Sequence, residues 1–411
     1  MTLANHVDPL WLRACAQRLV AAPSEQTDLF EQDPMIQQFL GGPVVAILDE
    51  IGLPHRRDGM GNVIVELGQP GDGPSLLIVA YAMTHPANRM ADPFKASLSD
   101  GATRLRGRGV AEQKGALAAA LAAVAAVRDT RLRGRLTLAI TSAGETGRHD
   151  AAASLLAALD HVPQMTIIAV GTSGRLALAN KGRIDVVVTI KGRAAHSSSP
   201  SAGIDAITGA RRVLDRVMAL DLGSGVHPGL GRATLAATSL RSWPEATHTI
   251  QDEVRLVFDR RLLPGDDPDA ALAAIAAAAD IGPPWDVSCV LGPHMYSAEI
   301  SPDGPLARAV AAGCAARGLP PLEPFFSSGA LDAGLFCARG AEAAMWGPGE
   351  TDLWHSDEES IALTDLLQGA EGYLGLVQAV LMPARDAATS DGGTGFRHPP
   401  QKPSPARHSE K

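Results

Sequence analysis

Uninterrupted apolar runs alternate with helical segments from the start of the chain to about residue 180. Strands are predicted at 75–83, 134–141 and 164–171, and helices at 114–130 and 150–160 between them. A strand without regular polar positions is typical of a sheet buried on both faces, and helices between successive strands indicate parallel pairing. We therefore predict an α/β fold in which helices cover a mostly parallel sheet.

The pattern changes near Gly182. Residues 183–194 and 252–263 alternate polar and apolar positions, as strands with one exposed face do, and helices are predicted at 204–220 and 267–281. Two helices on one side of an antiparallel sheet, about 110 residues in all, would form a second domain of ordinary size. The pattern therefore predicts an α+β domain here.

The helix–strand alternation resumes with a predicted helix at 301–318, so the α+β domain is expected to be an insertion, with linkers near Gly182 and Gly292. The tail is rich in Gly, Pro and Ser and has no periodicity, which predicts disorder. The expected organisation is a main domain in two parts, residues 1–182 and 294–383, an inserted domain, residues 183–293, and a disordered tail, residues 384–411.

Composition excludes several kinds of partner. The net charge of −9 disfavours nucleic acid, because phosphate binding needs a basic face. There is no run of about 18 apolar residues that would predict a membrane span, and the N-terminus lacks the pattern of a secretory signal. The cysteines have no CxxC spacing, which is typical of reduced cysteines in a cytoplasmic protein. They are Cys15, Cys289, Cys314 and Cys337.

Three residues with metal-binding chemistry lie at predicted strand ends. Glu112 follows a glycine-rich turn, Glu145 follows the strand 134–141, and His355 follows a strand at 341–347. In open α/β sheets, ligands bind outside the carboxyl ends of the strands. Two carboxylates and an imidazole suit a divalent transition metal that keeps open positions for water and substrate. Spacing alone also allows three unrelated loop residues.

Four longer motifs occur in a fixed order along the chain. They are RGRGVAEQKGALAA (106–119), IKGRAAHSSSPSAGIDAI (190–207), FDRRLLPGDD (258–267) and WGPGETDLWHSDEES (346–360). Together they resemble the motifs of the M20 metallopeptidase and aminoacylase family, over about residues 75–368. The resemblance implies a metal-dependent hydrolase whose catalytic domain carries an inserted lid and dimerisation domain.

The chain departs from this family at one of its two metal sites. Tyr81 stands at the position of the family's first histidine ligand, and Met83 at the aspartate that orients it. Gly144 stands at the position of the general-base glutamate. The last acidic ligand of the family falls in a segment that offers only Val170, Gly171 and Thr172.

The second metal site keeps a complete set of ligand positions. Glu112 stands in place of the bridging aspartate, and Glu145 and His355 match the other two ligands. The resemblance therefore implies one divalent transition metal ion, Mn, Zn, Fe or Co, held by these three residues. Glu145 is also expected to be essential for catalysis.

The lid motifs imply substrate contacts. His196 matches the histidine that in this family reaches across a dimer and stabilises the developing oxyanion, so a homodimer or larger homo-oligomer is expected. Arg261 matches the arginine that grips a substrate carboxylate, although a structural ion pair is equally compatible with its sequence position. His248 stands at the position of the family's substrate-binding asparagine.

Because Gly144 has no side chain at the position of the general base, the residue that accepts the proton from water is not identified by the motif. His85 or His149 could replace the missing base, and His85 could instead add a metal ligand. Tyr81 could contact the substrate or fill the space of the lost ligand.

Three functions remain compatible with these residues. The first is a one-metal hydrolase acting at a C–N bond of a small carboxylate-bearing substrate, similar to 5-nitroanthranilate aminohydrolase of this family. The second is a conventional N-acyl amino acid amidohydrolase or peptidase. The third is an inactive relative that binds a small molecule.

Overall fold

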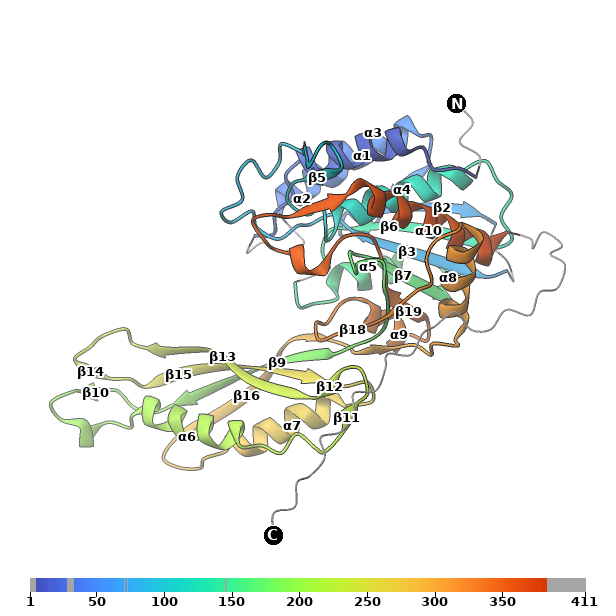
Figure 1. The fold of residues 1–411 in the computed structure, drawn as a ribbon. Helices are drawn as coiled ribbons and strands as arrows, with labels where there is room; N and C mark the ends of the chain where they lie inside the picture. The colour runs from blue at the N-terminus through green and yellow to red at the C-terminus, as the bar shows by residue number, and fades with distance from the viewer. Residues whose placement is uncertain (1–4, 28–32, 70, 72, 145, 383–411) are drawn as a thin grey trace, which may run out of the picture.

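The computed structural model describes residues 5–27, 33–69, 71, 73–144 and 146–382. Its largest sheet has six strands in the order β1-β2-β6-β3-β7-β19 (Figure 1). The neighbours β6, β3, β7 and β19 pair in parallel, whereas β1 and β2 are antiparallel. The predicted mostly parallel sheet is thus confirmed. The strands are β1 (His55–Arg57), β2 (Val63–Gly68), β3 (Ser75–Tyr81), β6 (Arg135–Thr141), β7 (Met165–Ala169) and β19 (Glu342–Met345).

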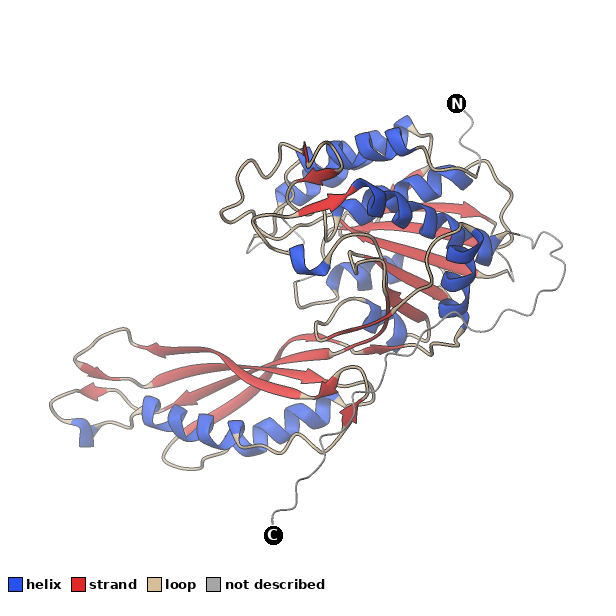
Figure 2. Cartoon of the chain, in the orientation of Figure 1, coloured by secondary structure: helices blue, strands red, loops and turns tan. Residues whose placement is uncertain are grey.

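Helices cover both faces of this sheet, as the unbroken apolar strands require (Figure 2). Ile78 of β3 faces a core formed with α1, α4, α8 and α10, and Val79 faces the opposite core with α5 and α9. The Ala-rich helix α4 is buried along its whole length. The helices are α1 (Pro9–Ala21), α2 (Pro34–Phe39), α3 (Val45–Glu50), α4 (Lys114–Val127), α5 (Asp150–Ala158), α8 (Pro305–Ala316), α9 (Ala333–Ala338) and α10 (Leu363–Leu381).

Two three-stranded sheets lie beside the main sheet, and they help to shape the loops of the site. One has the order β17-β8-β18 and the other β20-β5-β4. The strands are β4 (Ser97–Ser99), β5 (Arg104–Arg106), β8 (Leu176–Asn180), β17 (Ala298–Glu299), β18 (Pro324–Ser327) and β20 (Ser360–Ala362).

The inserted domain is a four-stranded antiparallel sheet, β13-β15-β9-β16, with α6 and α7 on one face. This confirms the expected α+β insertion. It projects away from the catalytic sheet, and β10 and β14 lie at its far end (Figure 1). Its elements are β9 (Gly182–Lys191), β10 (Ala195–His196), α6 (Ala206–Met218), β11 (Val226–His227), β12 (Gly231–Arg232), β13 (Thr234–Trp243), β14 (Thr249–Ile250), β15 (Glu253–Leu262), α7 (Pro268–Ala279) and β16 (Asp286–Met295).

The inserted domain, called the lid below, is joined to the rest of the chain by strands. Gly182 is the first residue of β9, and Gly292 lies inside β16 at a register irregularity, so neither glycine forms a separate linker. Among the described residues, no helix is long and apolar enough to span a membrane. The predicted tail, residues 384–411, lies outside the described residues.

Candidate active site

Glu112 and His355 meet at the edge of the catalytic domain although they lie far apart in the sequence. Nε2 of His355 lies 3.2 Å from Oε1 and 3.1 Å from Oε2 of Glu112. The Glu112 side chain is buried, whereas the His355 ring is 44% exposed, so the pair opens toward solvent on one side. His355 has a positive φ of 59°, an uncommon conformation for a non-glycine residue that is found mostly in turns and at functional sites.

The loop that carries Glu112 is fixed by Glu359. The buried carboxylate of Glu359 accepts hydrogen bonds from the backbone N–H groups of Gly109 (2.9 Å) and Ala111 (3.0 Å). It also pairs with the buried guanidinium of Arg108 at 2.8 Å. Burial raises the pKa of Glu359, and the backbone hydrogen bonds and Arg108 oppose that shift. Glu359 is part of the last motif, but its sequence position gave no sign of this role.

His85 joins the pair from the segment that follows β3. Its ring stacks on that of His355, with centroids 3.9 Å apart and planes 15° apart. The segment is anchored by Glu25, whose Oε1 accepts a hydrogen bond of 2.6 Å from the backbone N–H of Ala87. The structure therefore places His85 next to the predicted metal ligands.

Glu145 lies outside the described residues. Ser142 before it and Ala151 after it in the sequence are both held by the buried side chain of Asn62. Oδ1 of Asn62 accepts a hydrogen bond of 2.8 Å from the N–H of Ser142, and Nδ2 donates one of 2.9 Å to the carbonyl of Ala151. Asn62 carries no signal in the sequence, because an asparagine before a strand is an ordinary turn residue.

Glu112 and His355 fit a shared metal ion. Ligand atoms on one small divalent ion lie roughly 3 Å apart, because each is about 2 Å from the metal, and the N–O distances of this hydrogen-bonded pair are compatible with that spacing. Within the described ranges, no group of three His, Cys, Asp or Glu residues forms a complete site by itself. A third protein ligand would have to come from Glu145 or from a movement of His85.

Tyr81 and Gly144, which the resemblance aligns with a metal ligand and with the general base of the family, pack against each other. Tyr81 is fully buried, and its hydroxyl donates to Oδ2 of Asp332 at 3.1 Å. A Cβ on Gly144 would lie 2.0 Å from Cε1 of the Tyr81 ring, so the ring leaves no room for a side chain at position 144. The predicted contact between Tyr81 and substrate needs correction, since the structure leaves the ring no exposed surface.

The segment at the family's last acidic ligand is equally closed. Gly171 donates its N–H to the carbonyl of Glu112 at 2.8 Å, and a Cβ there would lie 2.0 Å from the carbonyl of Ala111. Val170 and Thr172 are fully buried. No side chain of this segment reaches toward Glu112 with a carboxylate, so the segment supports the loop of Glu112 instead.

Both ring nitrogens of His149 have hydrogen-bond partners. Its Nδ1 is 2.7 Å from Oδ1 of Asp332, and its Nε2 accepts a hydrogen bond of 3.0 Å from the N–H of Tyr296. Both ring nitrogens are therefore engaged in a buried network. Asp332, which organises this network, was not anticipated from the sequence.

The lid residues stand apart from this cluster in the same chain. The exposed rings of His196 and His248 lie 6.1 Å apart on β10 and before β14, at the far end of the lid (Figure 1). Arg261 donates from Nε and Nη2 to Asp259 at 2.7 and 3.0 Å. The structure thus contains the ion pair that the sequence analysis left as an alternative for Arg261.

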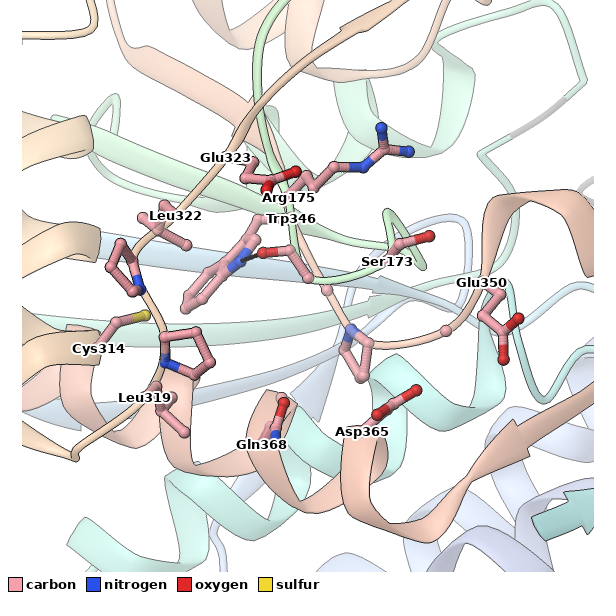
Figure 3. A pocket seen from close by; sticks show the side chains of 17 residues that line it. Ser173, Arg175, Cys314, Leu319, Leu322, Glu323, Trp346, Glu350, Asp365 and Gln368 are labelled. Carbon is pink, nitrogen blue, oxygen red and sulfur yellow. Dashed lines mark hydrogen bonds between the residues drawn. The ribbon is translucent and has the colours of Figure 1, made fainter. Parts of the chain in front are cut away.

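A separate groove of about 530 Å³ lies behind the loop that leads to His355 (Figure 3). The segment 346–350 forms one wall, and Glu323, Asp365 and Gln368 lie around it. Glu112, His85 and His355 do not line this groove. It is therefore distinct from the candidate active site.

Comparison with known proteins identifies the family of the chain. The family model described as peptidase family M20/M25/M40 matches residues 83–379. Acetylornithine deacetylase from Myxococcus xanthus is 26% identical over 322 residues, which cover 75% of this chain and 80% of that protein. The chain spans about half the length of the uncharacterized protein YgeY from Escherichia coli, at 25% identity over 227 residues, 54% of this chain and 55% of that protein.

Solved structures show the same fold. A tripeptidase from Staphylococcus aureus matches with a TM-score of 0.70 at 19% identity, over 91% of this chain and 99% of that one. A Bacillus subtilis protein described as a dinuclear metal-binding peptidase of the M20 family matches with a TM-score of 0.64 at 16% identity, over 90% and 97% of the two chains. At these identities the likeness concerns the fold alone.

Proposed function

Because the chain belongs to the M20/M25/M40 peptidase family, we propose that it is a hydrolase with one divalent transition metal ion that cleaves a C–N bond of a small carboxylate-bearing substrate. Glu112, His355 and Glu145 would hold the ion, which is Mn, Zn, Fe or Co. The observation that carries the proposal is the approach of His355 Nε2 to both carboxylate oxygens of Glu112.

The one-metal stoichiometry is supported by what fills the other site. The Tyr81 ring packs against Gly144 and the carbonyl of Ala111 packs against Gly171, so neither position has room for the acidic side chain that the family carries there. The Bacillus subtilis protein of the same fold is described as dinuclear, and we propose that these positions account for the difference.

The residues around the ion have separate tasks. A bound divalent metal polarises the substrate and makes its water more acidic. His85 accepts the proton of the attacking water, because it is the imidazole nearest to His355 and position 144 has no room for a base. Arg261 binds the substrate carboxylate through the part of its guanidinium that Asp259 does not engage.

The remaining contacts come from a second copy of the chain. His196 and His248 are exposed and close together at the end of the lid, too far along it to serve the site of their own chain (Figure 1). In a homodimer formed through the lid, His196 would donate a hydrogen bond to the developing negative charge, and His248 would contact the substrate.

Two substrate classes follow from this arrangement. Acetylornithine deacetylase, one of the relatives, acts on an N-acyl amino acid according to its name. A substrate whose own electron-withdrawing group stabilises the transition state, such as a nitro-substituted aromatic amine, would depend less on a strong base. The closed position 144 favours the second class.

Turnover assays with purified metal-loaded protein test this proposal. Release of amino acids from N-acyl amino acids and release of ammonia from aminobenzoates separate the two classes. Glu112→Gln and His355→Ala should abolish turnover, whereas the control Glu358→Gln, whose side chain is 81% exposed, should not. Undiminished turnover in His355→Ala, or substrate binding without any turnover in the native protein, would overturn it.

A further inference from the structure

A series of hydrogen bonds, buried at Tyr81, His149 and Asp332, runs from β3 of the main sheet to the residue that follows the last strand of the lid. It joins four segments that are distant in the sequence: the end of β3, the residue before α5, the residue before α9 and the residue after β16. The four residues are Tyr81, His149, Asp332 and Tyr296. None of them belongs to the proposed metal ligands.

Asp332 is at the centre of this series of hydrogen bonds. Its Oδ2 accepts the Tyr81 hydroxyl at 3.1 Å, and its Oδ1 is bound by Nδ1 of His149 at 2.7 Å. The Asp332 side chain is 1% exposed. Because a buried carboxylate is stable only when its oxygens are hydrogen-bonded, the two donors and Asp332 fix one another's positions.

On one side of Asp332, the hydrogen bonds lead through Tyr81 to Gly144. The Tyr81 ring lies where a Cβ on Gly144 would come within 2.0 Å of Cε1 and 2.1 Å of Cζ. A ring held at its hydroxyl end cannot swing aside without breaking the bond to Asp332. Asp332 therefore keeps position 144 closed.

On the other side of Asp332, the hydrogen bonds lead through His149 to Tyr296, at the end of the lid's last strand. Since Nε2 of His149 accepts the N–H of Tyr296, the ring carries its hydrogen on Nδ1 and donates it to Asp332. The rings of His149 and Tyr296 are stacked, with planes 7° apart. Tyr296 directly follows β16, the strand by which the chain leaves the lid.

We propose that Asp332 is a positioning residue that sets both the Tyr81 ring against Gly144 and the return strand of the lid against the catalytic domain. The lid carries Arg261, so this contact fixes the distance between the carboxylate-binding residue and the metal ligands. The kinetic part of this inference rests on the proposed function, but the structural part does not.

The structural part is tested by combining substitutions at positions 144 and 332. Gly144→Ala should lower the melting temperature of the native protein, and the loss should be much smaller in Asp332→Ala or Tyr81→Phe, where the hydrogen bond that holds the ring is removed. Non-contacting sites normally give additive effects, so additive losses in both backgrounds would overturn the proposal. Tyr81→Phe keeps the ring and serves if Asp332→Ala does not fold.

Hydrogen exchange tests the hydrogen bonds on the lid side of Asp332 without any activity. Asp332→Ala removes the acceptor of His149 and should speed exchange of the Tyr296 amide by roughly five- to tenfold, the factor expected for loss of one hydrogen bond. The exposed control Asp303→Ala should leave it unchanged.

In the active enzyme, Asp332→Ala should raise KM more than it lowers kcat, whereas a merely structural defect lowers kcat with the folded fraction and leaves KM unchanged. An unchanged rate of hydrogen exchange at the Tyr296 amide would overturn the positioning role. If the hydrolase proposal alone fails, turnover will be absent while the change in hydrogen exchange is still observed.

Discussion

The imidazole of His85 stacks on that of His355, with 3.9 Å between the ring centroids, directly beside the carboxylate of Glu112. Two histidines that are distant in the sequence thus lie next to each other, and one of them, His355, contacts the buried side chain of Glu112. Glu112 and His355 belong to the metal site whose ligand positions are kept, whereas the ligand positions of the family's other metal site are lost from the sequence.

Removal of either member of the central pair should weaken metal binding. His355→Ala and Glu112→Gln each remove a proposed ligand, so the loss should exceed the roughly 10–100-fold that loss of an outer-shell partner costs. Isothermal titration with Mn or Zn measures this loss. The exposed control Glu358→Gln should bind metal like the native protein.

His85 should affect catalysis more than metal affinity. If it accepts the proton from water, His85→Ala lowers kcat by about 10²–10⁴-fold, the usual contribution of a general base, while the metal affinity changes little. A parallel loss of metal would assign His85 to the ligands instead.

Glu359 should prove essential for the loop that carries Glu112. Glu359→Gln leaves the buried guanidinium of Arg108 without its ionic partner, which costs about 3–5 kcal/mol when one member of a buried pair is removed. Urea unfolding measures this difference. An effect within about 0.5 kcal/mol, the size expected for a surface site, would contradict the role described for Glu359.

Alkaline pH should destabilise the protein through Cys15. Burial raises the pKa of this thiol from 9.0 to about 12, while Arg18 opposes the shift. Between these values the folded chain keeps a proton that the unfolded chain loses, so stability falls by up to about 1.4 kcal/mol per pH unit. The difference in unfolding free energy between the native protein and Cys15→Ala should therefore shrink between pH 9 and 10.5, and it should stay constant below pH 8.

The parts of the fold that the sequence predicted are those with a strong periodic signal. β3 and α4 are buried along their whole length, so their composition is almost purely apolar. β13 was not predicted, because it is an edge strand of the lid whose Ser, Thr and Ala residues are largely exposed. Such a strand has no apolar alternation for its pattern to reveal.

The site was predictable only in part, for a related reason. Glu112 and His355 stand at strand ends within recognisable motifs, and the structure brings them together. Asp332, Glu359 and Asn62 are buried polar residues whose partners are distant in the sequence. Nothing local distinguishes them from surface residues, since only the tertiary structure supplies their hydrogen bonds.

The central claim is that one metal ion is held by residues from three remote segments, and the metal content of the purified protein tests it most directly. Elemental analysis after dialysis against Mn or Zn should give one ion per chain in the native protein and none in His355→Ala. Two tightly held ions per chain, or one ion retained in His355→Ala, would contradict the account.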